Sequence, residues 1–439
     1  MSIDAIESAL KPCLKIKQDL LERSWNDKIV DTLAIRLRYR LGSQATRACT
    51  ARGGDIHIHI SCVDCGANCY QQQESHIKSH TSAAKVSSMQ NIISQFRYVF
   101  LMSALLMAVT LSGSTRVYAQ KVVVAHRGAS GYLPEHTLEA KAMAYAMGAD
   151  YLEQDVVMTK DDQLLVLHDI TLERTTDVAS RFANRARSDG HYYAIDFTLA
   201  ELRQLRVNEG VREEVNTRSA VYPERFPVDA SSFRLNTLEE EIEFIQGMNK
   251  STGRDVGIYL ETKKPEFHRA EGKDLSTAVI NVLKRYGYTT KQHKVFVQTF
   301  SYEELKILHE EVLPAAGVSL NLVQLIDGEA TYGWMLDAQG MKELARYADG
   351  LGPEKSMIID RDSTPDDIII NDLVELAHAN GMQVHPYTFR ADEGQVPHFA
   401  ENFEELLDLY YFDANVDGVF TDFPDKAVNF LRSKARTTR

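Results

Sequence analysis

Cysteine is absent from most of the chain. All five cysteines of the 439-residue sequence lie within its first seventy positions, and they are Cys13, Cys49, Cys62, Cys65 and Cys69. The rest of the chain must therefore fold without a disulfide. The segment CVDCGANC, with His57 and His59 nearby, offers ligands of the kind that zinc prefers, but the spacing is incomplete and little apolar periodicity surrounds it.

A basic excess is also missing. Aspartate and glutamate together number 62, against 49 lysines and arginines, and the formal net charge is -13. A protein that binds nucleic acid needs a basic face. We therefore expect no nucleic-acid partner.

The apolar segment at 98–111 is too short to cross a membrane, because a spanning helix needs roughly 20 apolar residues. Arg97 precedes this segment. Val117 and Ala119 follow it and place small side chains at the two positions that a signal peptidase inspects. The pattern is typical of a secretory signal.

We therefore expect residues 89–119 to be a signal peptide, with Met89 as the true start. Residues 1–88 are then an extension that comes from a mis-assigned start or is disordered. No cysteine follows the apolar segment, so a lipid anchor of the lipobox type is excluded. The expected mature protein, residues 120–439, is periplasmic or secreted and has no stable membrane insertion.

From residue 120 onward, short apolar runs alternate with helical patterns, which is typical of βα units around a parallel sheet. Eight runs read as core strands: residues 121–126, 151–157, 257–262, 294–299, 320–326, 347–351, 382–388 and 417–421. Eight such units predict an α/β fold of the TIM (β/α)8 barrel class. A doubly wound open sheet is the alternative architecture.

Helix signals lie between these runs. Thr137 can cap a helix that ends at Gly148. Thr237 and Glu240 form a capping box before a second helix. These signals fall where a barrel requires its outer helices.

The stretch of about 170–236 is too long for an ordinary barrel loop, so we predict an insertion after the second strand. Thr198 and Glu201 give this insertion a capping box of its own. A small subdomain over the mouth of the barrel would exclude water and select substrates. A merely decorative insertion is the alternative.

Charged side chains stand at or just past the ends of several apolar runs. The motifs are VVVAHRGASGYLPEHT, YLEQDVVM, LLVLHD and IYLETKK, and the candidate residues are His126, Arg127, Glu153, Asp155, His168 and Glu261. Barrel enzymes keep their chemistry at the ends of the strands. Glu153 and Asp155 are two apart on one strand, so their side chains leave the same face and can hold one cation.

These residue types suit the cleavage of a phosphodiester. Three carboxylates form an oxygen cage for calcium, magnesium or manganese rather than zinc or copper. Arg127 offers a planar fork to phosphate oxygens, while His126 and His168 can divide the acid and base steps in either order. Water and a neighbouring glycerol hydroxyl are both suitable nucleophiles. In the alternative without a metal, Arg127 or Lys263 simply pairs with the carboxylates.

Four motifs together carry a resemblance: HRGASGYLPEHT, YLEQDVVMTKDDQLLVLHD, LETK and GVFTDFPD. They closely resemble the glycerophosphodiester phosphodiesterase family, in particular its periplasmic bacterial branch, and the resemblance covers residues 120–439. It implies a TIM barrel with an insertion after the second strand. It also implies hydrolysis of small glycerophosphodiesters, such as glycerophosphocholine, to an alcohol and glycerol 3-phosphate, with calcium as the cofactor and magnesium as the second choice.

The resemblance assigns roles residue by residue. The paired histidines of the family match His126 and His168, its phosphate-binding arginine matches Arg127, and a lysine near the phosphate matches Lys263. The metal carboxylates match Glu153, Asp155 and Glu261. His136 departs from the pattern, because the broader family usually has asparagine there.

Three further residues are weaker candidates for the substrate pocket, with ordinary core packing as the alternative: Gln298, Tyr387 and Phe423. We interpret His385 as a hydrogen-bonded histidine at a strand end and Trp334 as packed under a loop. The acidic run at 239–244 is interpreted as a solvated helix face.

Two other functions stay open. A barrel enzyme that cleaves lipids, of the phospholipase or sphingomyelinase D type, would want an exposed apolar rim, and no such loop stands out. A non-catalytic surface binding protein would not need the full set of histidines, arginine and carboxylates. The sequence indicates no oligomeric state.

Overall fold

The computed structural model describes residues 39–41, 45–52, 55–62, 121–214 and 217–437. The chain divides into two units, Met1–Gly113 and Ser114–Arg439. The described part of the first unit is an antiparallel sheet in the order β1-β2-β3, with β1 (Tyr39–Leu41), β2 (Ala45–Arg52) and β3 (Asp55–Cys62). The segments 63–69 and 89–119 lie outside the described residues, so the signal peptide stays a prediction and the structure does not test the zinc ligands offered by CVDCGANC.

The second unit is built on eight parallel strands in the order β13-β12-β11-β10-β9-β5-β4-β14. Backbone hydrogen bonds join the two ends of this order, because Phe420 N–H donates to Pro386 O (3.0 Å) and Phe389 N–H to Phe420 O (2.8 Å). The TIM-barrel prediction is confirmed. The strands are β4 (Val122–Ala125), β5 (Tyr151–Met158), β9 (Gly257–Thr262), β10 (Val295–Thr299), β11 (Asn321–Ile326), β12 (Gly350–Pro353), β13 (Gln383–Val384) and β14 (Gly418–Thr421).

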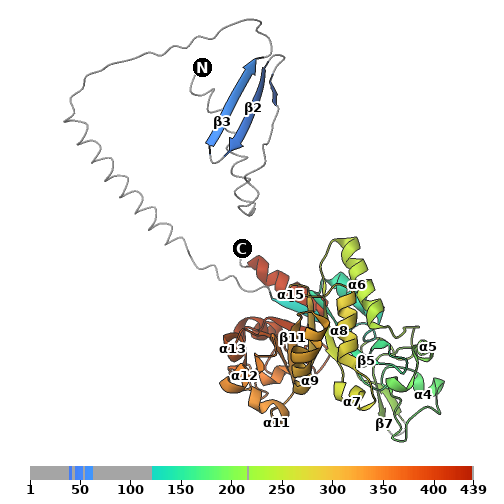
Figure 1. Cartoon of the computed structure of the whole chain (residues 1–439). Helices are drawn as coiled ribbons and strands as arrows, with labels where there is room; N and C mark the ends of the chain where they lie inside the picture. Colours follow the sequence, from blue (N-terminus) through green and yellow to red (C-terminus); the bar gives the residue numbers. More distant parts are fainter. Residues whose placement is uncertain (1–38, 42–44, 53–54, 63–120, 215–216, 438–439) are drawn as a thin grey trace, which may run out of the picture. The chain divides into compact units, whose positions relative to one another are not determined.

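Helices follow the strands around the barrel (Figure 1). The predicted caps are present: Thr137 accepts from Ala140 N–H at 3.2 Å, and Gly148 ends that helix with φ 101°. None of the helices in the described ranges is long and apolar enough to span a membrane. The α-helices are α3 (Leu138–Met147), α6 (Leu238–Thr252), α7 (Pro265–Ala270), α8 (Leu275–Arg285), α9 (Tyr302–Ile307), α10 (Leu313–Ala316), α11 (Glu329–Tyr332), α12 (Ala338–Leu344), α13 (Leu373–Ala379), α14 (Phe403–Asp408) and α15 (Pro424–Thr437). Between them lie the π-helices η4 (Leu308–Val312) and η7 (Leu409–Asp413) and the 3-10 helices η5 (Gly333–Met335) and η6 (Lys355–Met357).

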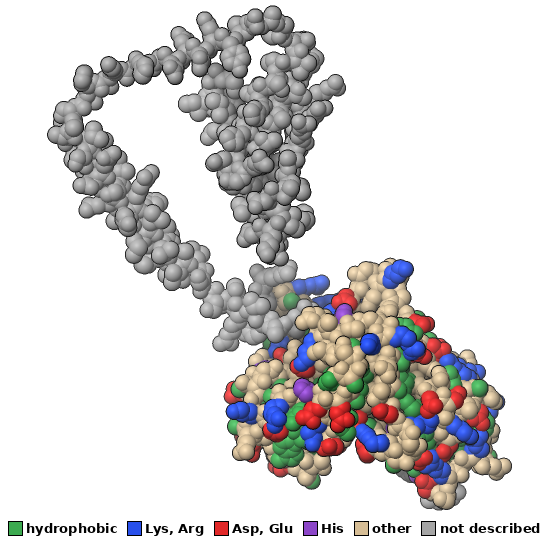
Figure 2. Space-filling view, viewed as in Figure 1, with side chains coloured by type: hydrophobic (Ala, Val, Ile, Leu, Met, Phe, Trp, Pro, Cys, Tyr) green, Lys and Arg blue, Asp and Glu red, His purple; other side chains and the backbone are tan. Residues whose placement is uncertain are grey.

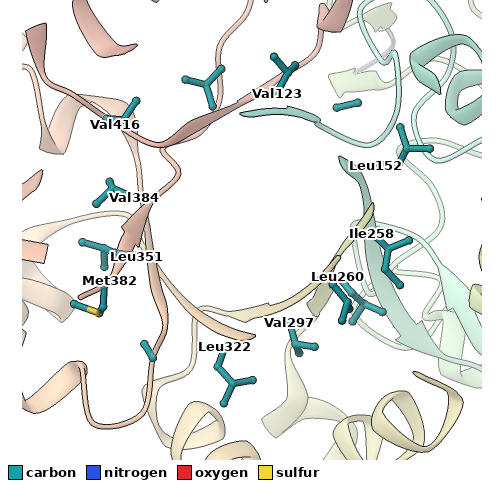
Figure 3. Close-up of a cluster of buried hydrophobic side chains, with 14 of the residues drawn as sticks. Val123, Leu152, Ile258, Leu260, Val297, Leu322, Leu351, Met382, Val384 and Val416 are labelled. Carbon is teal, nitrogen blue, oxygen red and sulfur yellow. The ribbon is translucent and has the colours of Figure 1, made fainter. Parts of the chain in front are cut away.

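The strands bury both of their faces. Alternate residues such as Val123, Ile258 and Leu322 point outward to the helices and form the large core, as the ring of strands in Figure 3 shows. Their neighbours point inward and fill the barrel with a second, smaller cluster, whose members are Val124, Tyr259, Phe296, Val323 and Phe420. This alternation is the period of two that a β-strand imposes. Inward positions nearer the carboxyl ends of the strands carry the polar residues of the site.

The insertion follows the second barrel strand. A short strand, β6 (Leu164–Val166), pairs antiparallel with β5 before the inserted chain begins. The inserted elements are α4 (Val178–Arg181), η3 (Ala194–Asp196), α5 (Leu199–Leu202), β7 (Val211–Glu214) and β8 (Thr217–Ala220). Thr198 and Glu201 form the predicted capping box. Residues of the insertion, including Leu172, Phe197 and Leu205, share a further apolar cluster with Val157 of β5 and Leu165 of β6, so the insertion packs as a small subdomain against these strands.

The surface of the second unit mixes charges of both signs. Figure 2 shows acidic and basic side chains interspersed over the face in view. Many of them form exposed ion pairs, such as Arg346 with Glu343 at 2.9 Å. Exposed pairs of this kind contribute little to stability.

Candidate active site

Three buried carboxylates converge at the carboxyl ends of two neighbouring strands. Glu153 and Asp155 lie on β5, and Asp155 is paired in register with Glu261 on β9. One oxygen from each of the three residues lies within 4.8 Å of the others. All three side chains point into the barrel because they share the inward face of their strands with Tyr259. The convergence expected from the sequence is present in the structure.

The electrostatics of this group fit a divalent cation. Lys263 Nζ lies 2.8 Å from Glu261 and 3.9 Å from Asp155, so one ammonium faces three carboxylates. The pairing considered in the metal-free alternative is therefore present for Lys263, and Arg127 Nε also lies 3.7 Å from Asp155, yet these two cations face three carboxylates. Asp155 Oδ1 is buried without a hydrogen-bond donor. An oxygen-only donor set with a surplus of charge is what calcium or magnesium requires.

The pKa values of the carboxylates reflect the same proximity of buried negative charges. Burial raises the pKa of Glu261 to about 7 although Lys263 opposes it. Burial and the charge of Asp155 raise the pKa of Glu153 well above its usual value. Burial would also raise that of Asp155, but Lys263 and His136 hold it well below the ordinary range. The three carboxylates do not all ionise easily without a compensating cation.

His126 follows β4 and is held by a remote aspartate. Its Nδ1 lies 2.5 Å from Oδ1 of Asp422, which follows β14. Burial would raise the pKa of Asp422, but Arg390 and His126 hold it well below the usual value, so the carboxylate accepts and Nδ1–H donates. Nε2 of His126 is then unprotonated and lies 3.9 Å from Glu153. Burial, assisted by Arg127, lowers the pKa of His126 to about 4.

His168 follows β6 and is held by its own neighbour. Its Nδ1 lies 2.6 Å from Oδ1 of Asp169, and Arg174 of the insertion pairs with the other oxygen of Asp169 at 2.5 Å. Burial, with Arg127 and Lys263, lowers the pKa of His168 to about 4. Its side chain is still 30% exposed. Both candidate histidines thus form a dyad with aspartate and are neutral at pH 7.

A single cavity of about 230 Å³ brings these groups together. Two strand-end cations, Arg127 and Lys263, share it with two cations that sequence reasoning missed, Lys355 and Arg390. The lining also holds four carboxylates, so the cavity can accept a phosphate on its cations and a metal ion on its carboxylates. The residues that line the cavity are His126, Arg127, Glu153, Asp155, His168, Glu261, Lys263, Gln298, Phe300, Leu325, Glu354, Lys355, Tyr387, Thr388, Arg390 and Phe420.

Arg127 is placed by an unusual turn. Its φ is 58°, in the left-handed region, and the next residue, Gly128, has φ 91°. In this conformation the Arg127 N–H donates to Glu153 Oε2 at 2.8 Å. The guanidinium donates to Glu135 at 2.8 Å, while its buried Nε lies 3.7 Å from Asp155 without a hydrogen bond. Within the described part of the chain, this Nε donor is thus left without a hydrogen-bond acceptor.

Two of the three weaker candidates line the cavity and one does not. Gln298 donates to Glu153 at 3.1 Å, so it supports a carboxylate. Tyr387 lines the cavity while its hydroxyl donates to Ile326 O at 3.0 Å. Phe423 is absent from the lining and packs edge-on against Tyr132, with ring centroids 5.2 Å apart.

His136, the departure from the family pattern, contacts the carboxylate group from outside the cavity. Its Nε2 lies 2.7 Å from Asp155 Oδ2, and its Nδ1 lies 3.4 Å from Lys141 Nζ. Lys141 also donates to the Glu153 carbonyl and pairs with Glu241 at 3.1 Å, with both side chains fully buried. The interpretation of 239–244 as a solvated face is thus wrong at Glu241, which points inward from α6 to neutralise Lys141.

Two other interpretations concern residues away from the cavity. His385 is buried, and its Nδ1 lies 3.0 Å from the Tyr259 hydroxyl, as expected of a hydrogen-bonded strand-end histidine. Trp334 was expected under a loop, but it is 41% exposed and packs edge-on against Tyr302. The short 3-10 helix η5 that carries Trp334 leaves one side of the indole uncovered.

The part of the chain that forms this cavity is similar to a known protein family. The model of the "Glycerophosphoryl diester phosphodiesterase family" matches residues 126–426, a span that includes every residue of the cavity lining. The chain belongs to this family. It is therefore an enzyme of the phosphodiesterase class, as the resemblance of its motifs implied.

Relatives within the family are similar over most of their length. A glycerophosphodiester phosphodiesterase of Haemophilus influenzae is 47% identical over 337 residues, which cover 73% of this chain and 92% of the relative. One from Treponema pallidum is 38% identical over 335 residues, or 72% of this chain and 94% of the relative. A solved Silicibacter pomeroyi structure, named for the same activity, superposes with a TM-score of 0.53 at 22% identity, covering 72% of this chain and 94% of that one. The last comparison supports the fold.

Proposed function

We propose that the chain hydrolyses glycerophosphodiesters, the deacylated headgroups of phospholipids, to an alcohol and glycerol 3-phosphate. The observation that carries the proposal is the meeting, in one cavity, of three carboxylates, two histidine–aspartate dyads and several cations. Membership in the family supports the substrate class. A cavity of about 230 Å³ suits a small, charged molecule rather than a lipid with its acyl chains.

In this proposal Glu153, Asp155 and Glu261 hold a divalent cation, with calcium as our first choice and magnesium as the second. When bound, such an ion supplies positive charge to a phosphate oxygen and makes a coordinated hydroxyl a better nucleophile. Arg127 and Lys263 bind the remaining phosphate oxygens. Their charges orient the diester and oppose the build-up of negative charge during attack.

His126 and His168 carry the protons. Because Nδ1 of each ring faces an aspartate, Nε2 is the atom that exchanges protons with the substrate. A neutral imidazole takes the proton from the attacking hydroxyl. The other imidazole, in its protonated form, gives its proton to the departing alkoxide oxygen. Either histidine fits either role.

The attacking group can be water or the glycerol hydroxyl next to the phosphate. Attack by the hydroxyl gives a cyclic phosphate that water then opens, whereas attack by water gives glycerol 3-phosphate in one step. Diesters that lack this hydroxyl separate the two routes. Full-rate cleavage of such diesters would exclude internal attack.

The primary test is a coupled assay for glycerol 3-phosphate on glycerophosphocholine. We expect release by the wild-type protein and by His191→Ala, which removes an exposed histidine of the insertion, but not by His168→Ala. No release from any glycerophosphodiester would contradict the proposal. Cleavage of intact phospholipid or sphingomyelin vesicles instead would favour the lipid-cleaving alternative.

We also propose that the enzyme acts outside the cytoplasm, after removal of residues 89–119. The support is the apolar run with its flanking arginine and small residues, which lies outside the described part of the structure. N-terminal sequencing of the exported protein tests this. A mature end near Gln120 is expected, and retention of residues before Met89 would contradict the proposal.

A further inference from the structure

One arginine of the insertion reaches the catalytic dyad of the barrel. Arg225 lies between β8 and α6, and its side chain is only 5% exposed. Its guanidinium forms two hydrogen bonds to Asp392, from Nε at 2.8 Å and from Nη2 at 2.7 Å. Nη2 also donates to Asp422 at 2.6 Å, and Nη1 donates to Ser130 O at 3.0 Å. The guanidinium stacks on Tyr222, 3.8 Å from the ring centroid.

These contacts tie three strand ends to the insertion. Ser130 follows β4, Asp392 follows β13 and Asp422 follows β14, so Arg225 joins the loops on either side of the seam where the barrel closes. A planar guanidinium has several donors in fixed directions, so it can bond Asp392, Asp422 and Ser130 at once, whereas a lysine ammonium cannot reproduce this geometry. The bidentate pair with Asp392 fixes the guanidinium in space.

Asp422 transmits this arrangement to His126. One of its oxygens receives Nδ1–H of His126, and the other receives Arg225 and Arg390, the latter at 2.8 Å. The carboxylate is buried, so its direction is set by these three donors. If one arginine is lost, the carboxylate can rotate and carry the imidazole with it. The position of Nε2 in the cavity therefore depends on Arg225.

We infer that Arg225 is a positioning residue for His126, supplied by the insertion and acting through Asp422. The inference rests on the proposed function, because it assumes that His126 transfers a proton to or from the substrate. Arg225 itself is not among the residues that line the cavity. Its removal should therefore lower kcat and leave KM nearly unchanged.

Another arginine of the insertion, more exposed than Arg225 at 30% against 5%, provides a control for the types of contact. Arg187 binds Asp196 through two hydrogen bonds of 2.7 and 2.8 Å and Glu271 of the barrel at 2.7 Å. It also stacks on Tyr193, with 4.4 Å between the guanidinium and the ring centroid. It thus joins the insertion to the barrel with the same kinds of contact, but without touching Asp422.

The test compares Arg225→Met, Arg225→Lys and Arg187→Met in the full chain. We expect Arg225→Met to lower kcat roughly 10- to 100-fold, as loss of a group that orients a functional histidine does, with Arg225→Lys in between and Arg187→Met near wild type. Nuclear magnetic resonance gives an independent readout: the downfield Nδ1–H proton of His126, identified by its loss in His126→Ala, should shift or disappear in Arg225→Met only. Arg225→Lys keeps the charge and serves if Arg225→Met does not fold.

The kinetic results on the two arginines decide whether Arg225 positions His126. A wild-type kcat in Arg225→Met, or an equal loss in Arg187→Met, would overturn the inference, as would a change confined to KM. A wild-type protein that releases no glycerol 3-phosphate would contradict the proposed function instead. In that case an unshifted Nδ1–H proton in Arg225→Met would still overturn the inference about Arg225.

Discussion

The two histidine regions of the cavity are built in contrasting ways. His126 is held by Asp422, which is 296 residues away in sequence and is itself fixed by Arg225 and Arg390. His168 is held by the next residue, Asp169, in a region where both side chains are about 30% exposed. One dyad is buried and assembled by tertiary contacts, and the other is formed by adjacent residues and is partly exposed.

The two histidines therefore depend on different parts of the fold. The His126 region needs the closed barrel and a docked insertion, because its partners come from β14, from the loop after β13 and from the chain after β8. The His168 region needs the turn after β6 and, from the insertion, Arg174, which Glu135 also holds. A change in the distant parts of the fold should therefore reach His126 first.

The largest expected effect comes from removing the imidazoles themselves. His126→Ala and His168→Ala should each lower kcat by roughly 10²- to 10⁴-fold, the range for a positioned acid or base. The double variant should be little worse than the poorer single variant, because the two groups act in one reaction. Steady-state kinetics on glycerophosphocholine measure this. A nearly wild-type kcat in either single variant would show that the substituted histidine does not transfer a proton in the reaction.

A smaller effect is expected from the two aspartates, and it should be unequal. Asp422→Asn removes the partner of two arginines in a buried site and should destabilise the protein by about 3–5 kcal/mol, with a clear loss of kcat. Asp169→Asn acts in a partly exposed ion pair and should cost about 1 kcal/mol or less. Urea unfolding and kcat, measured on both variants, compare the regions. Equal losses would contradict the contrast between them.

The pH dependence of stability should change by about 2 kcal/mol, an amount between the effects of the two aspartate substitutions, and His385 isolates this contribution. Burial lowers the pKa of His385 to about 4, from an ordinary value of 6.5, so the folded protein binds fewer protons than the unfolded chain between these values. Stability from this group is present above pH 6.5 and is lost as the pH falls toward 4. Between pH 7 and pH 5, the free energy of unfolding should therefore fall by about 2 kcal/mol less in His385→Gln than in the wild-type protein.

Urea unfolding of both proteins at the two pH values, in the presence of a chelator, measures this difference. His385 suits the purpose because it is buried like His126 but does not line the cavity. Equal losses in the two proteins would show that burial does not control the protonation of these histidines.

Much of the barrel could be predicted from the sequence, because buried parallel strands are short apolar runs and each of the eight runs overlaps an observed strand. The carboxylates Glu153, Asp155 and Glu261 could be predicted to converge, because the carboxyl ends of neighbouring parallel strands meet at one edge. Asp169 was also within reach of the sequence, since it directly follows His168 in the motif LLVLHD.

The remaining features depend on how the barrel closes. Asp422 reaches His126 only because β14 pairs with β4, and no local pattern marks that contact. Arg225 lies in the insertion, where hydrophobic periodicity gives no register with the barrel. Glu241 reads as one of several surface acids, and only the buried Lys141 opposite it explains why it points inward.

Three carboxylates from separate parts of the sequence, Glu153, Asp155 and Glu261, are proposed to bind one cation, and hydrolysis by the two imidazoles is proposed to depend on it. Calorimetric titration of calcium into chelator-treated protein, with glycerol 3-phosphate release followed in parallel, tests it most directly. We predict binding of one calcium per chain, recovery of activity with occupancy, and loss of both in Glu261→Gln but not in Glu304→Gln, a buried carboxylate paired with Arg269 outside the cavity. Full activity in the chelator, or unchanged binding in Glu261→Gln, would contradict the account.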